Sequence, residues 1–199
     1  MDEFKLTIEK SVVLDIGAGP SPKPDATECM DVHQWPSTTK IHDLHAFPYP
    51  YEDNYAEKIY LGDVIEHLVF LAAPLALKEI HRILKPGGTF EITCPDVMWI
   101  MERIVKNDWK EKANVEWLSR HEDPWDNTMD YLFGGWRHPE EFKIPGMGHI
   151  NGFNEKKLVA MLEDAGFTDI NRVPDERNPE PARDAVLKIV CHKTVNVVP

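Results

Sequence analysis

A short buried strand that runs into a glycine turn and then into a proline-rich loop most constrains how this chain can fold. The segment 11–16, SVVLDI, is apolar and β-branched, and the sequence GAGP follows it at 17–20. This pattern predicts a strand that ends in a tight turn, where glycine permits close approach of another backbone or a ligand. The stretch 20–24, PSPKP, cannot be helical, because proline lacks the N–H donor and keeps the preceding residue extended. We therefore expect the crossover helix after the first strand to be shortened or missing.

Strand and helix patterns alternate along most of the remaining chain. Strand-like runs cover 27–32, 56–61 and 89–94, and two closing strands are expected at 167–172 and 184–191. Helical patterns cover about 73–84, 97–107 and 155–165, the last lying between Asn154 as N-cap and Gly166 as C-terminal cap. The alternation predicts an α/β fold of Rossmann-like, doubly wound type. Its sheet should be mostly parallel, covered on both faces and completed by an antiparallel strand, with ligand at the carboxyl ends of the strands.

We expect a single domain over residues 1–199, with an aromatic-rich cap at 107–150. A chain of 199 residues with 42% hydrophobic content suits one substantial core. From 109 to 150 the periodicity loosens, and five of the six tryptophans lie between positions 99 and 136. Two interpretations of the cap stay open, namely an aromatic wall for a substrate and a hydrophobic insertion packed on the core.

The charge balance bears on the class of partner. Lys and Arg total 22 against 34 Asp and Glu, which gives a formal net charge of −12 and disfavours DNA, RNA and anionic membranes. No apolar window approaches the roughly 18 residues that span a bilayer, and the first residues lack a secretory signal pattern. The cysteines at 29, 94 and 191 are far apart, so neither a disulfide framework nor a zinc site is indicated. We expect a soluble, cytoplasmic protein of undetermined oligomeric state.

A G-x-G pair alone is a weak signal for any cofactor. The dinucleotide fingerprint G-x-G-x-x-G would require glycine where this chain has Pro22, and prolines replace the helix that should receive the pyrophosphate. The sequence therefore counts against NAD and FAD.

Five stretches, in order, carry a more specific signal. They are LDIGAGPSPKP at 14–24, ECMDV at 28–32, HDLHAFPYPYEDNYAEKIYLGDVIEHL at 42–68, ALKEIHRILKPGGTFEITCPD at 76–96 and GHINGFNEKKLVAMLEDAGF at 148–167. Together they resemble the class I S-adenosylmethionine-dependent methyltransferases, in particular the short type 11 branch with a Pro-Lys-Pro loop and little first helix. The resemblance implies a methyltransferase-like domain that uses S-adenosylmethionine to methylate an oxygen or nitrogen of a small-molecule or glycan acceptor. The alternative is a non-catalytic scaffold or partner subunit that binds the same cofactor.

The resemblance also implies which residues hold the cofactor. Asp31 stands where the family binds the ribose, and a carboxylate at a strand end can accept both ribose hydroxyls. Asp43, with the Leu44 backbone beside it, corresponds to the site for the adenine amino group, and the glycine turns would surround the methionine part. The full predicted cofactor set is Asp15, Gly17, Gly19, Asp31, Val32, Asp43, Leu44, Gly62 and Asp63.

Two groups of residues raise the question of a metal. Asp63, Glu66 and His67 are spaced i, i+3, i+4 and would share one face of a helix, similar to a carboxylate-x-x-carboxylate-His run of the quinone-pathway methyltransferases, which have Glu in place of Asp63. Oxygen-ligand sites need more donors than these, so we expect no metal, with a divalent ion as the alternative. The loop histidines at 33, 42 and 45 are expected to be solvated, without a zinc ion.

The acceptor side is less well specified. No Asn/Asp-Pro-Pro-Tyr/Phe signature follows the fourth strand, which with the acidic charge favours a small molecule or glycan over nucleic acid. Methyl transfer depends mainly on alignment and exclusion of water, and a general base is needed only if the acceptor keeps its proton. The candidate catalytic residues are His67 and His149, and the candidate substrate residues are Asp96, Trp136 and His138, the last also a possible base. A purely structural role is the alternative for each histidine.

Overall fold

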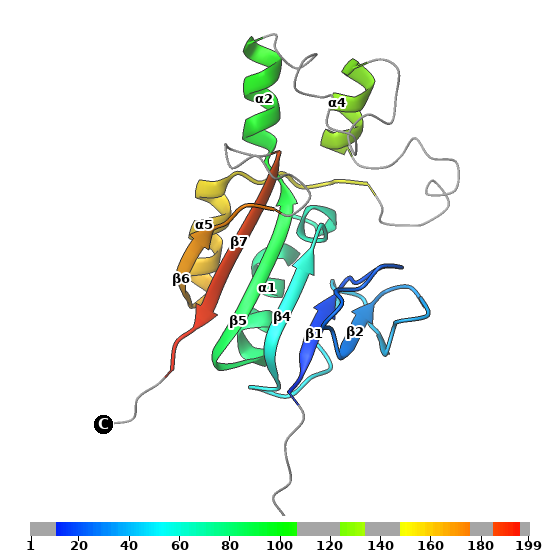
Figure 1. The fold of residues 1–199 in the computed structure, drawn as a ribbon, viewed down its shortest axis with the longest axis vertical. Helices are drawn as coiled ribbons and strands as arrows, with labels where there is room; N and C mark the ends of the chain where they lie inside the picture. Colours follow the sequence, from blue (N-terminus) through cyan, green and yellow to red (C-terminus); the bar gives the residue numbers. More distant parts are fainter. Residues whose placement is uncertain (1–10, 107–123, 134–147, 176–184, 196–199) are drawn as a thin grey trace, which may run out of the picture.

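The computed structural model describes residues 11–106, 124–133, 148–175 and 185–195, and Figure 1 shows their fold. They form one seven-stranded sheet in the order β3-β2-β1-β4-β5-β7-β6. The strands are β1 (Val13–Ile16), β2 (Glu28–Asp31), β3 (Lys40–Ile41), β4 (Ala56–Gly62), β5 (Leu84–Pro95), β6 (Phe167–Arg172) and β7 (Val186–Lys193). The helices are the 3-10 turn η1 (Ile65–His67) and the α-helices α1 (Ala72–Ile83), α2 (Val97–Lys106), α4 (Pro124–Phe133) and α5 (Glu155–Ala165).

The sheet is parallel from β3 to β5. β1 pairs with β2 and β4 in parallel, with Leu14 opposite Glu28 on one side and Ile59 on the other. β7 runs antiparallel to both β5 and β6. The predicted mostly parallel sheet with a closing antiparallel strand is therefore confirmed. The carboxyl ends of β1, β2, β4 and β5 meet at one edge, where such sheets bind ligands.

One face of the sheet carries the apolar core. α1 and α5 both lie behind the strands in Figure 1 and pack against this face. Alternate strand residues and helix residues at spacings of three and four meet there, as the two backbone periods require. The core includes Leu14, Ile16, Ile59, Leu61, Phe90, Ile92, Leu187 and Ile189 from strands and Leu77, Ile80, Leu158 and Leu162 from helices. We expected helices on both faces, but α1 and α5 share this one, and α2 and α4 stand beyond the carboxyl ends of the strands.

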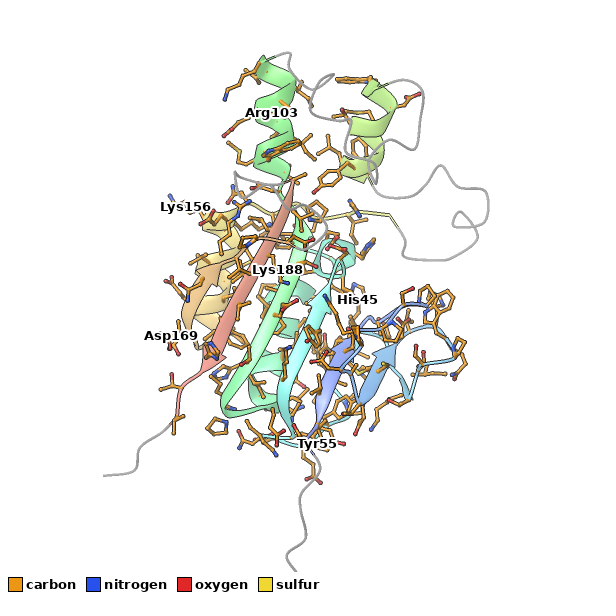
Figure 2. All side chains as sticks on the ribbon, viewed as in Figure 1. His45, Tyr55, Arg103, Lys156, Asp169 and Lys188 are labelled. Atoms are coloured by element: carbon orange, nitrogen blue, oxygen red, sulfur yellow. The ribbon has the colours of Figure 1, made fainter. Side chains whose placement is uncertain are left out.

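The opposite face carries charged and polar side chains. Figure 2 shows Lys188 on this face, turned away from α1 and α5. Its ammonium lies 3.2 Å from Glu91 Oε1, and the ammonium of Lys23 lies 3.5 Å from the same oxygen. Lys23 belongs to the proline-rich loop and also sits over the ring of Tyr60. The described residues between β1 and β2 contain no helix, so the predicted loss of the crossover helix is confirmed and the loop lies over this face in its place.

The helix boundaries follow from the caps. In α5 the Asn154 side chain accepts a hydrogen bond from Lys157 N at 2.8 Å, and Gly166 ends the helix with a φ of 100°. Both caps were predicted. The helix predicted at 73–84 and the strand predicted at 89–94 left residues 85–88, KPGG, between them, but these residues belong to β5. Residues 85–88 oppose only Glu57 of β4, so β5 begins with a bulge whose turn needs the positive φ of Gly87.

Two elements were not predicted from the sequence. β3 is a two-residue strand parallel to β2, too short to show a periodic pattern. α4 lies within the predicted cap at 107–150, most of which falls outside the described residues. Among the described residues, no helix combines the length and the apolar character that spanning a bilayer requires.

All three cysteines are free and buried. Burial raises the pKa of each thiol, for Cys191 to about 12. They therefore behave as small apolar residues of the sheet.

Candidate active site

The glycine turn after β1 lies at the carboxyl edge of the sheet. Gly17 and Gly19 have φ angles of 70° and 58°, in the region that side chains rarely adopt. A Cβ on Gly17 would lie 2.4 Å from Val64 Cγ2, so this glycine lets the turn pack against the loop after β4. A Cβ on Gly19 would meet nothing within 4 Å. Gly17 therefore serves close packing, whereas Gly19 faces open space that a ligand can use.

Asp31 ends β2 beside this turn and is only 6% exposed. Its Oδ2 accepts a hydrogen bond from Gly19 N at 2.9 Å, and its Oδ1 accepts one from His33 N at 2.8 Å. Each carboxylate oxygen has a second lone pair after these bonds. Asp31 thus joins the glycine turn to the loop after β2 and can still accept two ligand hydroxyls.

The expected adenine site lies after β2 and β3. Val32 is 51% exposed and offers an apolar surface beside Asp31. Asp43 Oδ1 accepts from His45 N at 2.9 Å, and this bond, with the nearby imidazole, lowers the pKa of Asp43. The carbonyl of buried Leu44 accepts a hydrogen bond from Tyr49 Oη at 3.1 Å. A planar base could therefore lie on Val32 with the ionised Asp43 near its edge.

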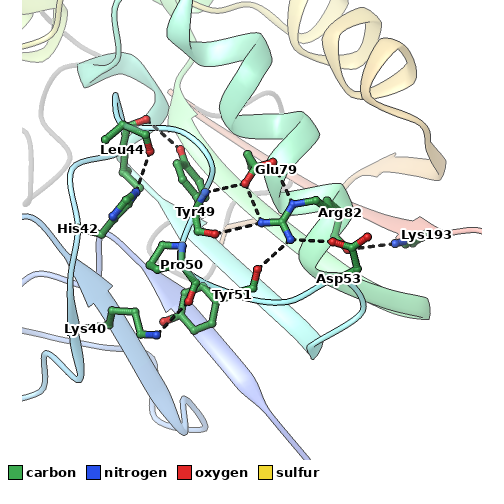
Figure 3. Close-up of polar contacts among 11 residues, drawn as sticks. Lys40, His42, Leu44, Tyr49, Pro50, Tyr51, Asp53, Glu79, Arg82 and Lys193 are labelled. Atoms are coloured by element: carbon green, nitrogen blue, oxygen red, sulfur yellow. Dashed lines mark hydrogen bonds and ion pairs between the residues drawn. The ribbon is translucent and has the colours of Figure 1, made fainter.

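Arg82 of α1 anchors the loop that follows this site, as Figure 3 shows. Its guanidinium donates to the carbonyl of Tyr51 at 2.8 Å and to that of Tyr49 at 3.1 Å. It also pairs with Glu79 and Asp53, each at 2.8 Å, and these carboxylates raise the pKa of Arg82. Sequence analysis did not identify Arg82, because nothing local to it shows that it reaches a loop about 30 residues earlier.

Asp15 has a different partner from the one expected. Its carboxylate is buried in β1, and Oδ2 accepts a hydrogen bond from Lys23 N at 2.8 Å. Burial is the main cause that raises the pKa of Asp15. Asp15 therefore holds the proline-rich loop onto the sheet, and a direct contact with cofactor stays a prediction.

The turn after β4 is tied to β5. Asp63 has a φ of 54°, its N donates to Thr93 O at 2.9 Å, and its Oδ1 accepts from Thr93 Oγ1 at 3.2 Å. A Cβ on Gly62 would lie 3.4 Å from the same hydroxyl. Gly62 and Asp63 thus form a fixed turn beside the glycine turn, since Val64 contacts Gly17.

The expected helical face of Asp63, Glu66 and His67 does not form. Only Ile65–His67 are helical, in the short turn η1, and Asp63 precedes it with a left-handed backbone. The structure instead brings Glu66 and His67 together with His149. One ring nitrogen of each histidine and one carboxylate oxygen of Glu66 lie within 4.8 Å of one another. We call these three residues the EHH cluster.

Main-chain contacts hold the EHH cluster in place. The nitrogens of Ile150 and Asn151 both donate to Glu66 O at 3.0 Å, which fixes the returning chain on η1. His67 Nδ1 lies 3.1 Å from Gly148 O, and His149 Nδ1 lies 3.1 Å from Tyr131 O. The two rings meet edge to face with centroids 5.0 Å apart.

Glu66 and His149 also face each other in this cluster. Glu66 is 2% exposed, and its Oε1 lies 3.9 Å from His149 Nε2. Burial, and secondly the neighbouring His67, lower the pKa of His149 to about 4. At neutral pH His149 is therefore an uncharged imidazole.

Of the expected substrate residues, only Asp96 lies in the described part of the chain. Asp96 is 1% exposed, and its Oδ1 accepts from Met98 N and Trp99 N at 3.1 and 3.2 Å, which caps α2. Its Oδ2 lies 3.3 Å from Arg172 Nη1. This carboxylate therefore holds the start of α2 and pairs with Arg172, and a contact with substrate stays a prediction. Trp136 and His138 lie outside the described residues.

Comparison with protein families identifies the chain. A family model described as a methyltransferase domain matches residues 4–171. No curated protein matches the sequence.

Several solved structures share the fold. The CurJ carbon methyltransferase is 17% identical with a TM-score of 0.55; the match covers 96% of this chain and 50% of CurJ, so this chain spans half the length of that protein. An S-adenosylmethionine-dependent methyltransferase from Methanosarcina mazei is 14% identical over 94% of each chain, with a TM-score of 0.54. The 1,6-didemethyltoxoflavin-N1-methyltransferase of Burkholderia thailandensis, with 1,6-didemethyltoxoflavin and S-adenosylhomocysteine bound, is 16% identical over 92% of this chain and 71% of that chain, with a TM-score of 0.52. Because the family model spans most of the chain and the sheet is the one these enzymes share, this chain belongs to the class I S-adenosylmethionine-dependent methyltransferases.

Proposed function

We propose that the protein transfers the methyl group of S-adenosylmethionine to an oxygen or nitrogen atom of a small-molecule or glycan acceptor. The observation that carries the proposal is the EHH cluster, whose imidazole and carboxylate groups lie near the predicted cofactor residues Gly17, Gly19, Asp31, Val32, Gly62 and Asp63. We call these predicted residues the cofactor edge. Val64 links the two parts, since it contacts Gly17 and lies two residues before Glu66.

The residues of the cofactor edge fit the predicted ligand. Asp31 has two lone pairs for a ribose diol, Gly19 leaves open space at the turn, and Val32 is exposed for the face of the base. We propose that Gly62 and Asp63 border the methionine part, whose ammonium suits the Asp63 carboxylate. When bound, S-adenosylmethionine supplies an electrophilic methyl group on a sulfonium, and the chain supplies alignment and exclusion of water.

His67 and His149 are proposed to orient the acceptor. Each ring is held through Nδ1 by a main-chain carbonyl, so Nε2 is the ring atom that we propose accepts a hydrogen bond from an acceptor O–H or N–H. A base works best with a pKa near the operating pH, and that of His149 is lowered to about 4. His149 is therefore proposed to position the acceptor more than to remove its proton.

The cap is proposed to complete the acceptor site. α2 and α4 stand beyond the carboxyl ends of the strands, above the cofactor edge in Figure 1. Trp136 and His138 stay predicted acceptor contacts, and Asp96 is proposed to act indirectly, by fixing the start of α2. A small acceptor is supported by the similar Burkholderia enzyme, whose structure holds 1,6-didemethyltoxoflavin.

Calorimetry and turnover test the proposal. We expect the purified protein to bind S-adenosylmethionine and S-adenosylhomocysteine at micromolar concentrations. We also expect an acceptor library to yield S-adenosylhomocysteine together with an O- or N-methylated product, identified by mass spectrometry and NMR. A carbon-methylated product would overturn the atom we propose. Binding without turnover of any acceptor would favour the non-catalytic scaffold.

A further inference from the structure

We propose that the EHH cluster, Glu66, His67 and His149, binds one divalent transition-metal ion. Its three side chains bring two imidazole nitrogens and one carboxylate oxygen within 4.8 Å of one another. This ligand set suits Zn²⁺ and other first-row divalent ions, and three protein ligands leave coordination positions open. Sequence analysis predicted no metal, because Asp63, Glu66 and His67 provide fewer donors than an oxygen-ligand site needs. In the structure, the imidazole of His149 joins Glu66 and His67 in the cluster, where the sequence had suggested the Asp63 carboxylate.

The orientation of both rings matches that of metal-binding histidines. A ring nitrogen 3.1 Å from a carbonyl oxygen carries the proton, so Nδ1 of His67 and of His149 donates to Gly148 O and Tyr131 O. In the neutral form of each ring the lone pair then lies on Nε2. Histidines that bind metals are oriented in this way: the ring nitrogen that does not bind the metal donates a hydrogen bond to a carbonyl or carboxylate.

The geometry needs little adjustment to accept an ion. Zinc ligands at about 2.0–2.2 Å from the metal lie about 3.3 Å apart in a tetrahedron. His149 Nε2 and Glu66 Oε1 are 3.9 Å apart and all three ligand atoms lie within 4.8 Å of one another, so side-chain rotations must bring them closer by about 1 Å. The backbone is already fixed, because Glu66 O holds Ile150 and Asn151. Glu66 is buried and the two histidines are partly exposed, which gives the ion a route of entry.

Titration with the metal alone tests the site. Tag-free protein is stripped with a chelator, dialysed and titrated with Zn²⁺ in a calorimeter and with Co²⁺ by visible absorption. We expect one equivalent to bind, a tetrahedral or five-coordinate Co²⁺ spectrum, and a rise in Tm with Zn²⁺. Glu66→Gln and His149→Ala should each weaken binding by at least about 100-fold, since loss of an outer-shell partner alone costs 10–100-fold.

His192→Ala provides the matched control, because His192 lies on β7 beside Thr89, away from the cluster. This variant should bind Zn²⁺ like the wild type. Circular dichroism checks that Glu66→Gln, which keeps the side-chain shape, is folded. Absence of binding by the wild type, or equal binding by Glu66→Gln and His149→Ala, would overturn the site.

The inference goes beyond the proposed function and can fail separately from it. With an ion bound through the Nε2 atoms, its open coordination positions would hold the acceptor in place of the hydrogen bonds to Nε2. Metal binding is measured without cofactor or acceptor, and S-adenosylhomocysteine binding is measured on the chelator-treated protein. A chain that binds S-adenosylhomocysteine but no metal keeps the proposed function and loses the metal site. A chain that binds metal through the cluster but no S-adenosylhomocysteine does the reverse.

Discussion

The cofactor edge and the EHH cluster lie side by side but are built in opposite ways. The cofactor edge uses residues close in sequence, and backbone N–H groups fix its carboxylates, as Gly19 and His33 do for Asp31. The EHH cluster uses side chains from η1 and from a segment about 80 residues later, held by carbonyls of three separate stretches. A site of the first kind depends on local turn geometry, whereas one of the second kind depends on how distant segments pack.

The largest expected effect tests the local turn. Gly17→Ala should lower the free energy of unfolding by about 2–5 kcal/mol, because it adds a clash with Val64 to the strain of a positive φ. Gly19→Ala, with a similar φ but open space, should cost only about 1–2 kcal/mol. Urea denaturation measures both. Equal losses of stability in the two variants would show that the contact between Gly17 and Val64 does not constrain the turn.

A second test removes the carboxylate of the cofactor edge. Asp31→Ala should weaken S-adenosylhomocysteine binding by about 100-fold or more, since hydrogen bonds to a charged group contribute about 1.5–3 kcal/mol each. Asp25→Ala is the matched control, because Asp25 is an exposed carboxylate that pairs with Lys58. Calorimetry should show unchanged binding for this control. Normal binding by Asp31→Ala would mean that the cofactor edge is wrongly placed.

A third test concerns the cluster and uses pH. The folded-state pKa of His149 is lowered to about 4, against about 6.5 unfolded, so the unfolded chain takes up the proton first as pH falls. The stability from neutral His149 is therefore complete above about pH 6.5 and is lost towards pH 4, by up to about 3 kcal/mol. His149→Gln should lack this part of the loss in urea denaturation with chelator present. If the free energy of unfolding falls equally with pH in the wild type and in His149→Gln, the assigned environment of His149 is wrong.

The smallest expected effect concerns Arg82, which anchors the loop after the expected adenine site. Arg82→Lys keeps the charge but cannot reach the Tyr49 and Tyr51 carbonyls together with Glu79, so S-adenosylhomocysteine binding should weaken about 3- to 10-fold. Lys78→Arg, on the exposed side of α1, is the control that should leave the affinity unchanged. An Arg82→Lys affinity equal to that of the wild type would show that the anchor does not position the cofactor edge.

The features that the sequence could predict are those built from neighbouring residues, as the cofactor edge is. The glycine turn, the missing crossover helix and the caps of α5 depend on neighbouring residues, and their patterns are local. The same holds for Asp31 at the end of β2. The family resemblance added the fold order and the cofactor.

Long-range features could not be predicted in this way. The pairing of His149 with Glu66 requires the path of the intervening chain, which no spacing in the sequence encodes. Asp96 stands at a strand end like a ligand-binding residue, but its side chain caps α2 instead. The bulge at 85–88 depends on the register between β4 and β5. In each case the local sequence allows more than one arrangement, and tertiary packing selects the one that forms.

The burial of all three thiols has a practical consequence for spectroscopy. Cys29, Cys94 and Cys191 are shielded within the sheet, and their raised pKa values keep the reactive thiolate scarce. A cysteine introduced on the exposed surface of α2 would therefore be the fast-reacting position for a maleimide dye, without removal of the native thiols. Fluorescence from such a dye could follow the surroundings of α2 as cofactor is added.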